Sequence, residues 1–229
     1  MILSYVSHKE FKLEKSGLKI ISTRSTIAYR DLVQGFEKVQ PTLICSNNKY
    51  EPLDIAKAFD FIGDILLTKN IIEKYMPHIL KSYIQKLDEE NRNKIFSAYH
   101  NLESLLQDSL LLEDLPLEID FNEDLKKLLK AENLHLDVKL LKEPYVIIES
   151  ILKIHQMCKI DSVPVICNVA NYLNSQQLQE LSNLVKQMKN LVKQMNMKLV
   201  LIEFTDKDFL IVPKNAEFFY IDEDLVDWY

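Results

Sequence analysis

Two continuous apolar runs near the C-terminus constrain the fold more than any other feature of this sequence. Residues 163–169 and 198–204 are β-rich and lack polar alternation, a pattern typical of strands that are covered on both faces of a sheet. The segment between them has the spacing of an amphipathic helix, and Asn174 or Ser175 can cap its start. Its apolar face consists of Leu178, Leu181, Val185, Met188, Val192 and Met195. Strand, helix and strand in this order predict a βαβ unit with a right-handed crossover, and therefore an α/β fold.

The N-terminal segment predicts further parts of an α/β fold. Residues 11–14 and 18–21 largely alternate apolar and charged side chains around Gly17, which indicates a β-hairpin. Residues 25–39 have helical spacing, and residues 42–45 form a short apolar strand before a polar turn. Two more short strands are expected near the C-terminus, at 209–212 and 218–221.

The middle of the chain predicts helices almost without a break. From Pro52 to Leu112 the spacing indicates three helices, of which the second contains Pro77 and should be kinked there. Two more helices are expected, at 123–131 and 144–159. We therefore predict an α/β head formed from both chain ends, 1–59 plus 155–229, and a central helical arm over 60–154.

Composition excludes several classes of site. The 229 residues include only 3 Gly, which are far apart, so a glycine-rich phosphate loop is excluded. Three cysteines without a Cys-x-x-Cys pair argue against a disulfide framework and favour a reducing compartment. The absence of an apolar run of about 18 residues and of a leader-like start predicts a cytoplasmic protein.

The formal net charge of −6 argues against a nucleic-acid-binding protein, but the charge is unevenly distributed. Residues 1–59 carry 9 basic and 6 acidic side chains, whereas residues 60–154 carry 12 and 18. Residues 181–202 contain four lysines and no acid. Because binding responds to the electrostatic field at the contact surface, a cationic contact surface remains compatible with a negative net charge.

The C-terminal pattern resembles a known family. Five consecutive features are similar to the end of a degenerate P-loop-type core. They are the strand 165–168, the following Tyr172-Leu173-Asn174, the long helix, the strand 199–203 and the closing segment 219–224. Together with the order of head, arm and head, they resemble the Csn-two family, small adaptation proteins of type II-A CRISPR systems. The similarity is clear over 163–229, looser at the N-terminus, and in the arm limited to length and helicity.

The resemblance implies a homotetrameric ring that binds the ends of linear double-stranded DNA without reading sequence. It also implies bound Ca²⁺, support of spacer acquisition beside other CRISPR adaptation proteins, and no enzymatic activity. The residues agree on one point: the P-loop position, Ser22–Ile27, has neither glycine nor lysine. A magnesium-holding acid is also replaced by an amide at Asn168, so no bound nucleotide is expected.

Lysines in three segments are the candidate DNA contacts. Such side chains can neutralise phosphates, although the alternative is a solvated outer surface. No aromatic residues are interleaved with them, which favours contact with a duplex backbone over single-strand binding. The candidates are Lys12, Lys15, Lys19, Lys126, Lys127, Lys130, Lys186, Lys189 and Lys193.

An acidic segment before the expected helix at 123–131 is the candidate Ca²⁺ site, because calcium prefers several carboxylate oxygens. The spacing starts like an EF-hand loop but lacks its glycine and its closing glutamate, so ligands from a second segment would be needed. The alternative is helix-start chemistry, in which Asn122 caps the helix and Glu123 and Asp124 complement its N-terminal dipole. The candidate ligands are Glu113, Glu118, Asp120, Glu123 and Asp124.

These observations predict a non-enzymatic ring protein that holds double-stranded DNA by its backbone. The first alternative is an α/β scaffold whose helical arm docks another protein and that does not bind DNA. The second is a small hydrolase or nuclease, since a catalytic triad can be assembled from residues far apart in sequence. The five histidines show no metal-ligand spacing and are expected to pack in the core.

Overall fold

The structure is a computed structural model that describes most of the chain. It covers residues 1–5, 10–13, 15–68, 71–111, 115, 117, 124–137, 142–188, 197–222 and 227–228. Backbone contacts divide the chain into unit 1, Met1–Lys74 with Asp137–Tyr229, and unit 2, Tyr75–Leu136. Unit 1 therefore contains both chain ends. The predicted arm of 60–154 includes β6 (Phe59–Gly63) and α6 (Pro144–Met157), which the structure places in unit 1.

Unit 1 is a mixed α/β structure around a largely parallel sheet. Within the described residues this sheet has the strand order β10-β9-β3-β8-β7-β6. The five strands from β9 to β6 are mutually parallel, and β10 is antiparallel to β9. The remaining strands are β3 (Gly17–Thr23), β7 (Val163–Cys167), β8 (Lys198–Glu203), β9 (Glu217–Ile221) and β10 (Asp227–Trp228).

The predicted βαβ unit is confirmed in its elements and its parallel pairing. Every residue of β7 is buried, as are five of the six residues of β8, as expected of central strands. Helix α7 (Ser175–Gln187) connects them and begins at Asn174 with a capping box, in which the Asn174 and Gln177 side chains bond each other's backbone N–H groups. The apolar positions 192 and 195 lie outside the described residues.

The predicted N-terminal hairpin is wrong. Strand β2 (Phe11–Lys12) pairs with β1 (Ile2–Tyr5), whereas β3 joins the larger sheet between β8 and β9. All seven residues of β3 are buried, so β3 fits the centre of a covered sheet and not a half-exposed hairpin. Gly17 still has the positive φ expected of it, 113°.

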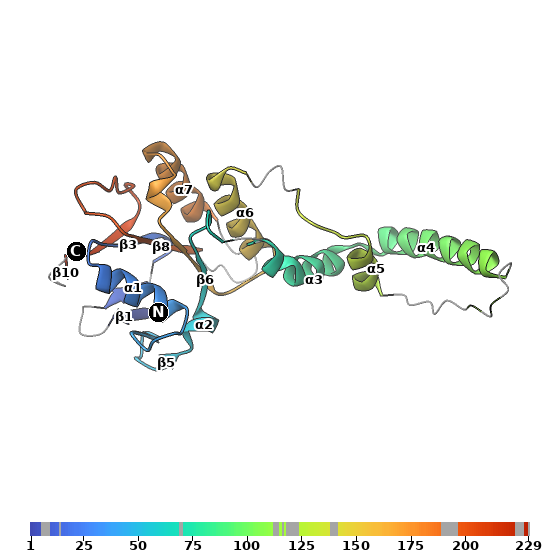
Figure 1. The fold of residues 1–229 in the computed structure, drawn as a ribbon, viewed down its shortest axis with the longest axis horizontal. Coiled ribbons are helices and arrows are strands. Elements are labelled where there is room, and N and C mark those ends of the chain that lie inside the picture. Colours follow the sequence, from blue (N-terminus) through green and yellow to red (C-terminus); the bar gives the residue numbers. More distant parts are fainter. Residues whose placement is uncertain are drawn as a thin grey trace. The chain divides into compact units, whose positions relative to one another are not determined.

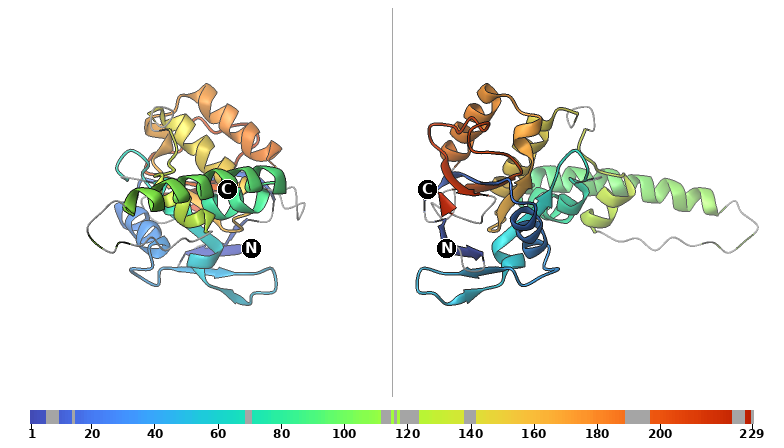
Figure 2. Two further views of the ribbon diagram at one scale, coloured as in Figure 1. Left: turned by 90° about the vertical axis from the view of Figure 1, so that its right-hand side faces the viewer. Right: turned by 60° about the vertical axis from the view of Figure 1, so that its left-hand side comes forward.

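A second, smaller sheet has the order β2-β1-β4-β5, with β4 (Leu43–Ser46) and β5 (Pro52–Leu53). It lies with helix α1 (Thr26–Phe36) on one side of the larger sheet, and α6 and α7 lie on the other (Figures 1 and 2). The core between the two sheets and α1 includes Leu3, Phe11, Leu32, Val200 and Ile202. Unit 1 is thus layered, with the parallel sheet in the middle.

The helix predicted after Pro52 is wrong over most of its length. Only a short helix, α2 (Ile55–Ala58), forms before β6, which pairs in parallel with β7. The aromatic residues of β6 pack on α1, where the Phe36 ring lies 5.1 Å from Phe59 and 5.9 Å from Phe61. The strand predicted at 209–212 is also absent from the described structure, and Phe209 and Ile211 are exposed.

Unit 2 is helical in its described residues. It contains α3 (Met76–Lys86), α4 (Glu89–Leu110) and α5 (Leu125–Ala131), which follow η1 (Glu73–Tyr75). Pro77 lies in the first turn of α3, where a backbone N–H would have no partner within the helix. Proline therefore removes no helical hydrogen bond there, and the predicted kink does not arise. Asp88 caps α4 through the N–H of Asn91, at 2.8 Å. Among the described helices, none has the length and apolar character needed to cross a membrane.

Candidate functional site

The amino-terminal edge of the parallel sheet brings distant lysines together. At this edge Gly17 of β3 is opposite Lys198 of β8, and the Gly17 N–H donates to the carbonyl of Met197 at 3.0 Å. The Lys198 ammonium donates to the carbonyl of Leu13, which lies between Lys12 and Lys15 in sequence. Leu13 and Gly17 are thus both held against the start of β8.

The end of α7 and the turn before β9 reach the same edge. The Lys214 N–H donates to the Gln179 side chain at 3.0 Å, which fixes this turn on α7. Lys186, in the last turn of α7, donates to the Asn215 side chain at 3.4 Å. Consequently Lys12, Lys15, Lys186 and Lys214 are all exposed on segments that meet at one edge of the sheet. We call these four residues and Lys198 the basic edge.

Sequence reasoning identified only part of the basic edge. Lys198 is one of the four lysines noted in residues 181–202, but Lys214 was not considered, because only the register of β3, β8 and β9 shows that it precedes a strand beside β3. Lys189 and Lys193 lie outside the described residues.

The prediction that Lys19 contacts DNA is wrong. Its side chain is only 1% exposed, and its ammonium lies 2.6 Å from a carboxylate oxygen of Glu217. The two residues are opposite each other in the pairing of β3 with β9. Because Lys19 is in the middle of a covered sheet, its charge is used in a structural ion pair and does not reach a phosphate.

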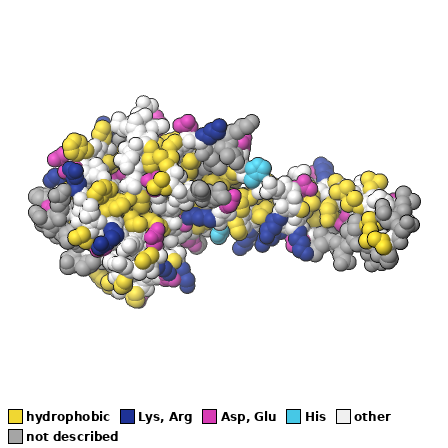
Figure 3. Space-filling model, in the orientation of Figure 1, with side chains coloured by type: hydrophobic (Ala, Val, Ile, Leu, Met, Phe, Trp, Pro, Cys, Tyr) yellow, Lys and Arg dark blue, Asp and Glu magenta, His cyan; other side chains and the backbone are white. Residues whose placement is uncertain are grey.

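In unit 2, Lys126, Lys127 and Lys130 are exposed on α5. Figure 3 shows Lys and Arg side chains gathered over α3 and α5. Helix α5 thus carries three cations within two turns.

Of the predicted Ca²⁺ ligands, the structure describes only Asp124. It is the N-cap of α5, and its carboxylate accepts the Lys126 N–H at 2.9 Å, so the cap is Asp124 and not the Asn122 that the sequence predicted. Glu113, Glu118, Asp120 and Glu123 lie outside the described residues. Among the residues that are described, no three His, Cys, Asp or Glu side chains are arranged to hold a metal ion.

The opposite, carboxyl-terminal edge of the sheet is acidic. Glu203 ends β8, and Asp64 directly follows β6. Burial raises the pKa of Glu203 to about 8, against the opposing effect of the Ala170 and Val169 N–H groups, and the charge of Asp64 raises it further. Sequence reasoning missed both acids and considered only Asn168, which follows β7 between them.

The segment at the P-loop position satisfies its own hydrogen bonds. The Thr23 hydroxyl accepts the Ser25 N–H at 3.0 Å, and the Ser25 hydroxyl accepts the Ala28 N–H at 3.3 Å at the start of α1. The Ser22 hydroxyl donates to the carbonyl of Thr205 at 2.6 Å. With carboxylates nearby, this edge suits phosphate groups poorly.

A buried histidine connects β6 to α6. His155 is buried, as expected for core packing, and its Nε2 lies 2.9 Å from Asp60. The same expectation is wrong for His78, His100 and His135, which are exposed. The other Asp60 oxygen accepts the Lys74 ammonium at 2.8 Å. This cluster joins three segments of unit 1.

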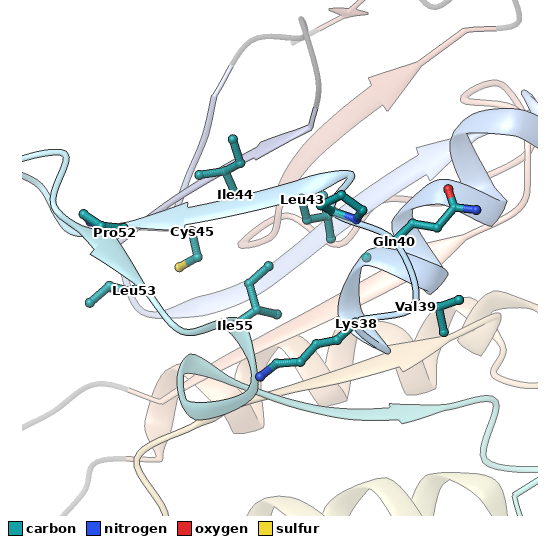
Figure 4. Close-up of a pocket in the computed structure, with 11 residues that line it drawn as sticks. Lys38, Val39, Gln40, Leu43, Ile44, Cys45, Pro52, Leu53 and Ile55 are labelled. Carbon is teal, nitrogen blue, oxygen red and sulfur yellow. The ribbon is translucent and has the colours of Figure 1, made fainter.

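An open groove of about 390 Å³ lies beside the smaller sheet (Figure 4). Its lining is mainly apolar and comes from the end of α1, β4, β5 and the start of α2. Lys38 at the rim is paired with Asp54 at 2.7 Å. The groove therefore offers an apolar surface with few free polar groups.

Comparison with known proteins supports the fold. No protein-family model matches the chain, and no curated protein matches it. The crystal structure of Stu0660 of Streptococcus thermophilus is similar, with a TM-score of 0.59 and 11% sequence identity, over 100% of this chain and 76% of that chain. The two chains share a fold. The predicted α/β class is thereby confirmed.

Proposed function

We propose that this chain is a non-enzymatic protein that binds double-stranded DNA by its backbone and supports spacer acquisition in a type II-A CRISPR system. The form that binds DNA would be a homotetrameric ring, with other CRISPR adaptation proteins as its partners. The resemblance of residues 163–229 motivates this proposal, and the fold shared with Stu0660 is compatible with it.

The observation that carries the proposal is the basic edge. Five lysines from four separate segments, Lys12, Lys15, Lys186, Lys198 and Lys214, meet there, and the carboxylate of Glu217 is already paired with Lys19. Lysine side chains gain affinity for DNA by releasing counterions from phosphates, without reading bases.

The two edges of the parallel sheet differ in charge, and this difference favours DNA binding at the amino-terminal edge. The amino-terminal edge carries the lysines, whereas the carboxyl-terminal edge carries Asp64, Glu203 and Asp206. Asp206 is paired with Arg24 and Glu203 is buried, so within the described residues this edge offers fewer unpaired cations to phosphates than the basic edge, and DNA is expected to favour the basic edge. Symmetric repetition in a closed oligomer would join several such edges into a belt.

Neutralising two exposed lysines of the basic edge tests the proposal. We expect Lys15→Gln with Lys186→Gln to weaken binding of a labelled linear duplex, measured by fluorescence anisotropy over a series of salt concentrations. Each lost phosphate contact should lower the slope of log affinity against log salt by about 1, so the slope should fall by about 2.

Lys207→Gln is the matched control, because Lys207 lies in unit 1 beyond the carboxyl-terminal end of β8. It should leave the slope unchanged. A double variant that binds DNA with wild-type affinity and salt dependence would refute the role of the basic edge.

A second candidate is a scaffold that docks another protein through its helical arm. Leu102, Leu105 and Leu106 on α4 are 50%, 68% and 45% exposed, respectively, and adjacent exposed apolar side chains of this kind are typical of protein interaction sites. If the wild-type chain does not retain duplex DNA even at low salt, this second function is favoured. Ca²⁺ binding by the segment that ends at Asp124 stays a prediction of the family resemblance.

A further inference from the structure

We propose that the carboxyl-terminal edge of β6, β7 and β8 holds a divalent cation between Asp64, Asn168 and Glu203. This site goes beyond the proposed DNA binding. It lies in unit 1, apart in sequence from the acidic segment that ends at Asp124.

The three residues end three adjacent strands of the sheet. The strand order places β7 between β6 and β8, and Cys167 is opposite Ile202 in the β7–β8 pair. The next residues on these strands are Asn168 and Glu203. Asp64 follows β6 on the other side of Asn168, whose amide nitrogen lies 3.4 Å from its carboxylate. The sheet thus brings two carboxylates to an amide.

An unsatisfied buried carboxylate points to a ligand. Glu203 is 2% exposed, and its Oε2 accepts the Ala170 N–H at 3.2 Å. Its Oε1 has no hydrogen-bond partner among the described residues. A buried carboxylate oxygen without a partner is costly, so a positively charged or donating group is needed beside it.

Asn168 has a second orphan oxygen. Its Oδ1 is buried and has no partner among the described residues, and its backbone is left-handed, with a φ of 59°. One cation beside both oxygens would satisfy Glu203 and Asn168 together, and the Asp64 carboxylate, which faces the amide nitrogen of Asn168, would add its negative charge to the site. Because all three side chains offer oxygen ligands, the chemistry suits Mg²⁺, Mn²⁺ or Ca²⁺ better than a soft metal. Asp64 and Asn168 are only partly buried, which leaves an approach from solvent.

The test uses Tb³⁺ as a luminescent probe and Mg²⁺ or Ca²⁺ as competitors on the full chain. Tyr29 and Tyr172 lie close to the site, since the Tyr29 hydroxyl interacts with Asn168 and Cys167, and the Tyr172 hydroxyl donates to the Cys167 carbonyl. We therefore expect tyrosine-sensitised Tb³⁺ emission that Mg²⁺ or Ca²⁺ displaces.

Two variants act in opposite directions. Glu203→Gln should weaken this binding by about tenfold or more, because an amide replaces a carboxylate ligand. Asn168→Asp should strengthen it by about tenfold, because it adds a third carboxylate, and aspartate tolerates the left-handed backbone. A gain of affinity cannot result from misfolding. Asp124→Asn is the matched control and should leave this site unchanged.

Equal Tb³⁺ affinity in the wild type, Glu203→Gln and Asn168→Asp would overturn the proposal. It would mean that Glu203 is satisfied by a proton on its own carboxyl group. DNA binding by the same variants should stay at the wild-type level, so failure of this site and failure of the basic edge can be distinguished.

Discussion

At the scale of single residues, Glu203 is a buried carboxyl group with a strongly raised pKa. Burial raises its pKa from the ordinary 4.5 to about 8, so the folded protein holds a proton that the unfolded chain releases between these pH values. The unfolding free energy should therefore decrease as pH rises through this window, by up to about 1.4 kcal/mol per pH unit, and level off above about pH 8.

The variant Glu203→Gln cannot ionise and should lose this pH dependence. In denaturant unfolding with a chelator present, the variant should gain stability relative to the wild type from pH 5 to pH 8. The exposed Glu180→Gln on α7 should follow the wild type at every pH. A Glu203→Gln profile parallel to that of the wild type would show that Glu203 ionises normally in the folded state.

At the scale of elements, α1 packs closely on the strand that follows it. A Cβ atom added at Gly35 would lie 2.6 Å from Cγ of Leu43 and 2.8 Å from the Thr42 hydroxyl. Leu43 is buried, and the Thr42 hydroxyl is held by the Asp31 carbonyl at 2.6 Å, so neither can move freely. Glycine is required here by the close approach and not by its backbone freedom.

We expect Gly35→Ala to lower the unfolding free energy by about 1–3 kcal/mol, although alanine is the better helix former. Thermal or denaturant unfolding measures this change. Thr26→Ala, at an exposed position of the same helix, should change stability by less than about 0.5 kcal/mol. Stabilisation by Gly35→Ala would show that α1 lies further from β4.

Helix α5 supports a separate expectation about DNA. Neutralising Lys126, Lys127 and Lys130 to Gln should lower the salt slope of duplex binding by up to about 3, if all three contact phosphates. Lys94→Gln on α4 is the control, because Lys94 is already paired with Glu90 at 2.5 Å. An unchanged slope in the triple variant would leave the basic edge as the DNA contact.

Which elements could be predicted depended on how local their signals are. The strands β7 and β8 and helix α7 were predictable, because uninterrupted apolar runs and a capping residue identify them without knowledge of the rest of the chain. The partner of β3 was not, because a turn at Gly17 does not determine which strand is adjacent in the sheet. Strand β6 was mistaken for a helix, since a short apolar run fits either periodicity.

The candidate sites show the same limit. The lysines on α5 are neighbours in sequence and were found together. Lys214 joins Lys198 at the basic edge, and Asp64 joins Glu203 at the acidic edge, only through the register of parallel strands. Lys19 has the same sequence character as Lys15, and only its pairing with Glu217 shows that it is buried.

At the scale of the whole molecule, an uneven distribution of charge would allow a chain of net charge −6 to hold DNA. Lysines are concentrated at one edge of the parallel sheet and on α5, whereas carboxylates occupy the opposite edge of the sheet. A closed oligomer would enclose the duplex and slow its release without any base contact, and it would accept DNA only where an end can enter.

Retention of linear against covalently closed duplex DNA tests this claim most directly. The protein is loaded on equal-length linear and closed circular DNA, the salt is raised, and the retained protein is measured by sedimentation. We predict that it remains on linear DNA whose ends are blocked after loading and is not loaded on closed circles. Equal retention on both forms, or on neither, would contradict the enclosed-duplex account.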